Sequence, residues 1–436
     1  MASRLPTEPP RGMRDILPPE AELRDWAAGT ILAVYRRHGF RRIETPALES
    51  LPLLTGGGGG ENEKLIFKVL KRGEKLDLAT VATEADLADL GLRFDLTVPL
   101  ARYYAHNHAK LPDPLKAVQI GPVWRAERPQ RGRYRQFTQC DIDILGVASE
   151  IAEIELILAT TEALGALGLE GLTVRINDRR LLAAVATWCG FEPARHAGVF
   201  ITLDKWDKLP PTEIRHELEE AGHPAPAVAR MLELYGQPDA ERELEAIRRR
   251  LDDADVDDTV ARLGRILDTV AAAAGDRFRV DFDPTLVRGM GYYTGPIFEI
   301  RSSSFAAGSI AGGGRYDGMI GGLLGRDVPA TGFSIGFERV VDIIGKMERR
   351  AAAGDKRIAL LFEESAPELG GVLEAAQALR AQGYLVALER QARNPGAQRA
   401  ALEKQGYDGV ATMGSGKAAQ VQWFGDRTPS RSGSRT

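Results

Sequence analysis

The sequence has few residues of the kinds that build disulfide-rich, metal-binding or membrane proteins. Its two cysteines, Cys140 and Cys189, provide neither a disulfide framework nor a zinc cluster, and they fit a reducing cytoplasm. The six histidines show no metal-ligand spacing, so we assign no metal to protein side chains. The N-terminus lacks the apolar core of a signal peptide, and no run of about 18 apolar residues occurs. We therefore expect a cytoplasmic protein without a membrane span.

The chain has no P-loop signature, and its match to the dinucleotide-binding signature is incomplete. Its net charge is also not positive. No GxxxxGK[ST] segment exists, which argues against a P-loop ATPase. Residues 414–419 have the letters of a dinucleotide-binding glycine turn, but we expect too little sequence after them for the next strand and its acidic residue. The net charge is -4, so a nucleic-acid partner requires a local basic surface.

The composition and length predict a soluble protein of two or three domains. The chain has 436 residues, of which 44% are hydrophobic and 27% charged. A helical pattern begins at Pro18 and ends near Gly39, and residues 41–46 then have the character of a strand. Apolar runs at 358–362, 385–388 and 409–412 alternate with helical segments, which predicts a small parallel α/β domain.

Two arginine-containing segments indicate a site for a nucleoside triphosphate. Arg125 lies in the segment VWRAER, which leads into GRYRQF, and Arg339 closes the segment GFSIGFER. A guanidinium group binds phosphate oxygens in pairs and also stacks on flat rings. The glycines beside these arginines allow the backbone to approach a ligand closely.

The strand-like segment at 137–143, a short distance after Arg125, carries an unusual polar face. Strand alternation puts Gln139, Asp141 and Asp143 on one side, in phase with Phe137. Such a row of polar residues either lines a wet cavity or belongs to a solvated edge strand. The run of glycines at 56–60 is likewise open to two interpretations, a linker or a lid that orders over substrate.

Two further segments carry the most specific resemblance in the chain. LVRGMGYYTG at 286–295 and AGGGRYDG at 311–318 resemble the two signature motifs of the histidyl-tRNA synthetase family. The segments around Arg125 and Arg339 resemble motifs 2 and 3 of class II aminoacyl-tRNA synthetases, and the helix and strand at 18–46 resemble motif 1. The family implies ATP-dependent activation of L-histidine and its transfer to tRNA(His), with Mg2+ accompanying ATP, by a homodimer.

The resemblance implies an α+β fold with a class II antiparallel sheet, flanking helices, a helical insertion and a small α/β C-terminal domain. We expect the chain to divide into residues 1–179 and 276–345 for the catalytic domain, 180–275 for the insertion, 357–425 for a shortened anticodon-binding-like domain and 426–436 for a disordered tail.

The resemblance also implies the residues that bind histidine. Asp95 and Thr97 are expected to hold its amino group. Gln139 and Asp143 are expected to hold the amino group and the imidazole end, and Tyr292 and Tyr293 to close the ring pocket. These six are Asp95, Thr97, Gln139, Asp143, Tyr292 and Tyr293.

The same resemblance implies the ATP-binding and catalytic residues. Arg125 and Arg288 are expected at the α-phosphate, as the two catalytic residues. Phe137 and Arg339 are expected to sandwich the adenine. The ATP-binding set is Arg125, Glu127, Arg133, Phe137 and Arg339, with Glu127 at the adenine end and Arg133 at the outer phosphates.

The sequence departs from the family's pattern at two places. Gly291 stands where the family usually has an acid, and the C-terminal domain is expected to be shorter than usual. The alternatives are therefore a non-charging paralogue, such as the regulatory subunit of ATP phosphoribosyltransferase, or a supplier of histidyl-adenylate to an acceptor other than tRNA.

Overall fold

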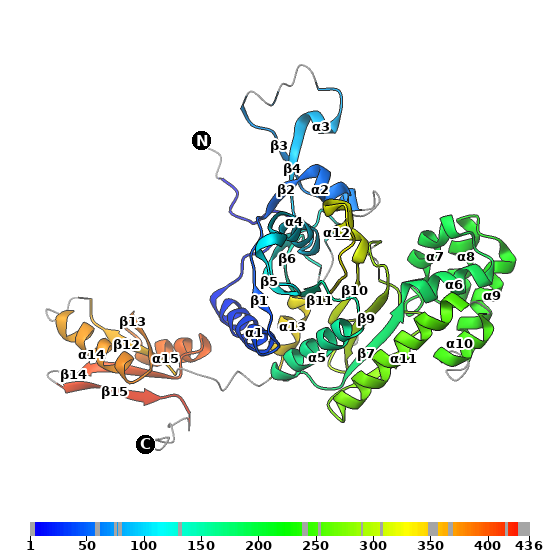
Figure 1. Cartoon of the computed structure of the whole chain (residues 1–436). Helices are drawn as coiled ribbons and strands as arrows, with labels where there is room; N and C mark the ends of the chain where they lie inside the picture. The colour runs from blue at the N-terminus through cyan, green and yellow to red at the C-terminus, as the bar shows by residue number, and fades with distance from the viewer. Residues whose placement is uncertain are drawn as a thin grey trace. The chain divides into compact units, whose positions relative to one another are not determined.

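The chain forms two compact units in the computed structural model (Figure 1). The first comprises Met1–Ile16 with Leu23–Lys346, and the second comprises Leu17–Glu22 with Met347–Thr436. The structure describes residues 5–56, 62–73, 76, 81–129, 133–237, 243–251, 254–288, 291–305, 308–347, 356–364, 369–414 and 417–425. Most of the glycine run, the dipeptide 289–290 and the C-terminal tail lie outside the described residues.

An eight-stranded sheet is the centre of the first unit. Its strand order is β1 (Arg41–Arg42), β5 (Leu115–Trp124), β6 (Gln136–Leu145), β11 (Ala330–Ile335), β10 (Ala311–Arg315), β9 (Pro296–Ser302), β7 (Leu172–Asp178) and β8 (Arg279–Phe282). Neighbours from β5 to β7 pair antiparallel, whereas β1 and β8 pair parallel to their neighbours. The predicted fold class is confirmed, with parallel pairings added at both edges of the sheet.

Helices cover one face of this sheet because the strands alternate in character. Along β6, Cys140, Ile142 and Ile144 are buried and apolar, and they alternate with the polar residues of the opposite face. The helices α5 (Ile151–Ala166) and α13 (Phe337–Ile344) pack against β6. The helix α5 is apolar almost all round, as expected for a helix buried between the sheet and a second helical layer. The polar face of β6 is left for a site.

The N-terminal helix agrees with the sequence pattern, and the strand after it is shorter than expected. Helix α1 spans Pro18–Arg37, and Ile31 and Tyr35 are completely buried. Only Arg41–Arg42 of the expected strand 41–46 pair with β5, and the Ile43 amide adds a hydrogen bond to the Val118 carbonyl at 3.0 Å. A three-stranded sheet of β2 (Leu48–Ser50), β4 (Ala88–Leu92) and β3 (Lys68–Leu70) follows, with the short helices α2 (Leu51–Gly56) and α3 (Glu84–Leu87).

Between β7 and β8 the chain forms a group of helices (Figure 1). They are α6 (Arg179–Cys189), α7 (His196–Leu203), α8 (Pro211–Glu220), α9 (Ala225–Tyr235), α10 (Leu244–Arg250) and α11 (Ala254–Ala274). Ile247, Leu263 and Ile266, which the helical pattern places on one face, are buried. We call this group the insertion. Two further helices, α4 (Thr97–Asn107) and α12 (Asp317–Leu324), pack against each other in the same unit.

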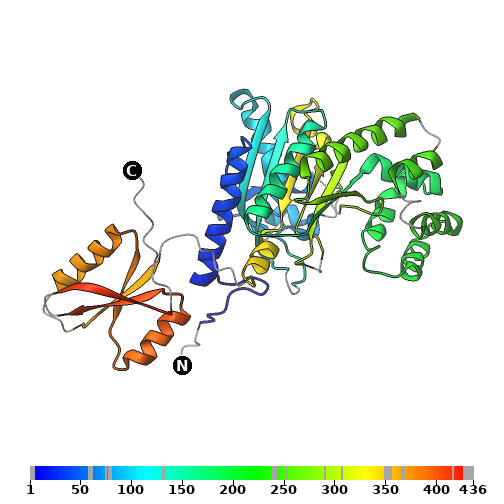
Figure 2. The same cartoon turned by 90° about the horizontal axis from the view of Figure 1, so that it is seen from below.

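The second unit is a four-stranded sheet with a helix on each face (Figure 2). Its elements are β12 (Arg357–Phe362), α14 (Leu369–Ala381), β13 (Leu385–Arg390), α15 (Pro395–Lys404), β14 (Gly409–Gly414) and β15 (Lys417–Trp423). The predicted strands are present, but the sheet is mixed because β15 pairs antiparallel with β14. The dinucleotide-like segment at 414–419 therefore joins two strands. A phosphate-binding turn needs a helix at this point, so the structure agrees with its rejection.

Candidate active site

A cavity of about 670 Å³ lies on the polar face of the large sheet. Its lining includes every residue predicted to bind histidine or ATP. Its floor is a row of register partners that crosses five strands: Asp141, Ser334, Gly312, Glu299 and Arg175. Register partners on neighbouring strands point to the same face, so a single polar row results. Because β6 is the third of eight strands, its polar face is not that of a solvated edge strand.

Two glycines in this floor make room for functional side chains. A Cβ at Gly312 would lie 2.5 Å from Nη2 and 2.6 Å from Nη1 of Arg288. A Cβ at Gly332, the register partner of Asp143, would overlap a carboxylate oxygen of that residue. At both positions a neighbouring side chain occupies the space of a methyl group, so alanine would displace Arg288 or Asp143 from its place.

Three aspartates lie together at one end of the cavity. Asp95, Asp141 and Asp143 are each less than 5% exposed. Burial raises the pKa of Asp95 to about 6 and that of Asp143 to about 7. Burial and the neighbouring charge of Asp143 raise the pKa of Asp141 well above its usual range. Such shifts arise where carboxylates share a desolvated site, and they are common at functional sites.

The acceptor oxygens around these aspartates lack partners. Asp95 Oδ2, Gln139 Oε1, Asp141 Oδ1 and Asp143 Oδ2 are buried, and none has a hydrogen-bond partner among the described residues. An unpaired buried acceptor costs about 1–3 kcal/mol. Four such acceptors in one cavity fit a ligand that carries several N–H donors.

Aromatic side chains form the wall next to the aspartates. Tyr292 and Tyr293 meet edge to face with ring centroids 4.8 Å apart, and Tyr316 follows 6.1 Å from Tyr292. The Tyr316 hydroxyl donates a 2.6 Å hydrogen bond to Asp143 Oδ1. This bond holds the carboxylate in place and lowers its pKa against the effect of burial. Thr97 begins α4 beside this wall and also lines the cavity.

Arginines and an aromatic ring also line the cavity, and the charge of Arg125 lowers the pKa of Asp95 and of Asp141. The Arg125 guanidinium stacks 5.1 Å from the centroid of Phe137, and its Nε donates to the Phe94 carbonyl at 3.0 Å. Burial lowers the pKa of Arg339, and the positive charges of Arg133 and Arg288 lower it further. Guanidinium groups that repel one another in this way favour a polyanion between them.

Hydrogen bonds join the backbone at Arg125 and Glu127 to Arg135, ten residues after Arg125. The Arg125 amide donates to the Arg135 carbonyl at 2.8 Å, and Arg135 Nε donates to the Glu127 carbonyl at 3.0 Å. These bonds hold Glu127 and Arg133 at the cavity, which both residues line.

Arg288 reaches the cavity from a segment that is hydrogen-bonded to the end of β7. Asn177 at the end of β7 donates to the carbonyls of Pro284 and Leu286, at 3.2 and 3.1 Å. The guanidinium itself lies over Gly312, 3.6 Å from a carboxylate oxygen of Glu299. Its Nε is buried and has no hydrogen-bond partner among the described residues.

Three residues that organise the site were not assigned from the sequence: Tyr316, Glu338 and Glu299. Glu338 accepts two hydrogen bonds from Arg24, at 2.7 and 2.8 Å, and one from the Thr138 amide at 2.9 Å. These contacts fix the start of α13 and hence Arg339. All three missed residues lie inside or next to recognised motifs, and this proximity was the only available signal.

Gly291, where an acid was expected, is exposed. A Cβ at this position would have no heavy atom within 4 Å. The glycine therefore leaves the packing of Tyr292 among the described residues unchanged.

Within the described ranges, no group of three or more His, Cys, Asp or Glu side chains could hold a metal ion. The described part of the chain also has no helix long and apolar enough to cross a membrane.

The sequence model of a family described as histidyl-tRNA synthetase matches residues 12–340. The histidine–tRNA ligase of Leifsonia xyli subsp. xyli (strain CTCB07) is 49% identical over 89% of this chain and 91% of its own. The probable histidine–tRNA ligase of Tropheryma whipplei (strain Twist) is 41% identical over 92% and 94%. These relatives do not favour a non-charging paralogue.

The fold is similar to that of a solved structure, the histidyl-tRNA synthetase from Nostoc sp. PCC 7120. The two superpose with a TM-score of 0.76 over 94% of this chain and 92% of the other, at 26% sequence identity.

Proposed function

This chain belongs to the histidyl-tRNA synthetase family, and we propose that its large cavity is where histidine and ATP react before histidine passes to tRNA. The protein is an aminoacyl-tRNA synthetase that activates histidine and charges tRNA. The observation that supports this site most strongly is that one cavity holds both buried acceptor oxygens without partners among the described residues and guanidinium groups that repel one another.

The acidic end of the cavity is suited to the donors of histidine. The ammonium group supplies three N–H donors, and the imidazole ring supplies at least one more. We assign Asp95 and Thr97 to the amino group, Gln139 and Asp143 to the amino group and the ring, and Tyr292 and Tyr293 to the ring faces. A side chain without the ring donors would leave buried acceptors unpaired, which costs orders of magnitude in rate.

The basic end is suited to the phosphates and base of ATP. Phe137 and Arg339 would hold the adenine between them, with Glu127 beside it, and Arg133 would bind the outer phosphates. Arg125 and Arg288 would bind the α-phosphate. ATP in this chemistry carries Mg2+, and we propose that the ion enters with the phosphates, because the described residues offer no three-ligand site of their own.

The reaction needs fixed positive charge where negative charge accumulates. The carboxylate of histidine attacks the α-phosphorus of ATP, the bond to the pyrophosphate oxygen breaks, and histidyl-adenylate forms. A terminal hydroxyl of tRNA then attacks the activated carbonyl, and AMP leaves. Arg125 and Arg288 stabilise the developing charge without reorganising, and the cavity holds the two reactants in contact.

We also propose that the protein acts in the cytoplasm as a homodimer, with the segment around α1 and β1 at the interface. The resemblance of this helix and strand to motif 1, which forms the dimer interface of class II synthetases, supports this arrangement. Size-exclusion chromatography with light scattering should give twice the chain mass of 47.4 kDa.

Pyrophosphate exchange with each standard amino acid tests the proposed site. We expect ATP–pyrophosphate exchange with histidine alone, and aminoacylation of tRNA(His) in a second assay. Arg288→Ala should lower the exchange rate at least about a hundredfold, as for the loss of a transition-state donor. Exchange with another amino acid, or a wild-type rate in Arg288→Ala, would contradict these assignments. Exchange without charging of any tRNA would indicate a different acceptor.

A further inference from the structure

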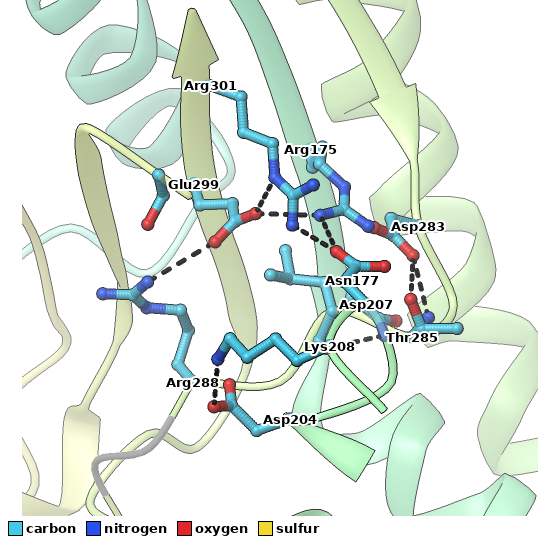
Figure 3. A network of polar contacts seen from close by, with 12 residues as sticks. Arg175, Asn177, Asp204, Asp207, Lys208, Asp283, Thr285, Arg288, Glu299 and Arg301 are labelled. Carbon is cyan, nitrogen blue, oxygen red and sulfur yellow. Dashed lines mark hydrogen bonds and ion pairs between the residues drawn. The ribbon is translucent and has the colours of Figure 1, made fainter. Parts of the chain in front are cut away.

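The guanidinium of Arg288 is part of a charge network that extends to the insertion (Figure 3). Glu299 is the central member of this network. One of its carboxylate oxygens accepts from Arg175 at 3.0 Å and from Arg301 at 2.9 Å. The other oxygen lies 3.6 Å from Nη1 of Arg288.

Asp207 connects the same two arginines to the insertion. It lies in the turn between α7 and α8, and its Oδ2 accepts from Arg175 at 3.1 Å and also from Arg301. Arg175 and Arg301 are therefore each shared between Asp207 and Glu299. Arg175 also pairs with Asp283, which fixes its guanidinium from a third side.

The turn that carries Asp207 is held firmly by the insertion. Lys205 Nζ lies 2.6 Å from a carboxylate oxygen of Glu217 on α8. Trp206 packs edge to face on Tyr235 of α9, with ring centroids 5.5 Å apart. A movement of the insertion helices would therefore move Asp207 relative to the sheet.

Few contacts fix Arg288 itself. Within the described part of the chain its guanidinium pairs with Glu299 alone and Nε has no partner, and the charge of Asp204 acts on it without a direct contact. The position of the guanidinium therefore depends on the position of the Glu299 carboxylate. That carboxylate is held by Arg175 and Arg301, whose other shared partner is Asp207.

We infer that Asp207 is a positioning residue for Arg288, acting through Arg175, Arg301 and Glu299, so that the insertion helps to set the geometry of activation. The inference rests on the proposed role of Arg288 at the α-phosphate. Without the charge of Asp207, the two shared arginines keep Glu299 as their common carboxylate and draw it away from Arg288. A displacement of about 1 Å at a reacting centre can cost up to a hundredfold in rate.

Asp207→Asn is the test variant, since Asp207 is 39% exposed and the amide fits the same space. Its matched control is Glu219→Gln, which removes a surface charge paired with Arg215 on α8, outside the network. We expect Asp207→Asn to lower kcat for pyrophosphate exchange about tenfold, with the KM for histidine unchanged. The control should retain the wild-type kcat, and both variants should unfold at the wild-type temperature.

A double-mutant cycle separates positioning from a general structural role. If Asp207 acts through Arg288, then Asp207→Asn should cause no further loss in an Arg288→Ala background. An equal tenfold loss in both backgrounds, or a wild-type kcat for Asp207→Asn, would overturn the inference while the role of Arg288 stands. A wild-type rate for Arg288→Ala alone would instead overturn the proposed role of Arg288, and the inference with it.

Discussion

Substitution of Gly312 by alanine should impair activation without harming the fold. Gly312 lies in the middle strand of the cavity floor, directly beneath the guanidinium of Arg288. The added Cβ would lie 2.5 Å from Nη2, whereas ordinary contacts begin at about 3.4 Å. Arg288 must therefore move by roughly 1 Å, which corresponds to a loss of up to a hundredfold in rate, or about 2.7 kcal/mol.

The assay is pyrophosphate exchange at varied concentrations of histidine and ATP. We expect kcat to fall between about tenfold and a hundredfold in Gly312→Ala, while the KM for histidine stays within about twofold. The thermal unfolding midpoint should not fall, because the three nearest heavy atoms all belong to the flexible end of Arg288, which can move aside. In addition, alanine gives the unfolded chain less conformational entropy than glycine, so less entropy is lost on folding. Gly264→Ala in α11 is the matched control, because a Cβ there would have no heavy atom within 4 Å.

Two outcomes would refute this reasoning. A wild-type kcat in Gly312→Ala would mean that Arg288 tolerates the displacement or acts elsewhere. A further loss when Gly312→Ala is added to Arg288→Ala would mean that the methyl group acts on something other than Arg288.

Four further predictions concern recognition. In pyrophosphate exchange, Asp143→Ala should raise the KM for histidine at least about tenfold while ATP binding stays nearly unchanged. Weaker binding of ATP with unchanged binding of histidine would mean that the histidine and ATP sites are assigned the wrong way round. Since the pKa of Asp143 is about 7, histidine affinity should fall as the pH drops below that value and the carboxylate takes up a proton. Tyr316→Phe removes the hydrogen bond that lowers this pKa, so the fall in kcat/KM should begin at higher pH than in the wild type, over a scan from about pH 6 to pH 9. An unchanged profile would contradict the role of Tyr316. The loop with Arg128, Arg133 and Arg135 is expected to meet the acceptor stem, so a minihelix with only the acceptor arm should inhibit charging nearly as well as tRNA(His). A strong loss of charging on anticodon substitution would show instead that the C-terminal domain reads the anticodon.

The parts of the site that lie along one strand could be predicted from the sequence. Alternation on β6 placed Gln139, Asp141 and Asp143 on one face, and the structure shows that face lining a cavity. Strand periodicity is a local property, so it does not depend on which strands become neighbours.

Contacts between distant segments could not be predicted in this way. The bond from Tyr316 to Asp143 joins residues 173 positions apart, and it exists because β10 and β6 both pair with β11. The network around Glu299 likewise depends on the neighbours of β9 and on the insertion. The pairing of β15 was also missed, since its short polar-apolar alternation overlaps the segment 414–419, whose sequence resembles another motif.

Isolation of the activated intermediate would show whether this protein forms histidyl-adenylate in its cavity and passes the histidine to tRNA. Wild-type protein is incubated with labelled histidine and ATP, freed of small molecules by gel filtration, and then mixed with tRNA(His). We expect a bound histidyl-adenylate that forms far more slowly in Arg288→Ala and whose histidine passes to tRNA with loss of the bound label. Absence of a histidine-dependent adenylate, or an adenylate that never passes to tRNA, would contradict the account.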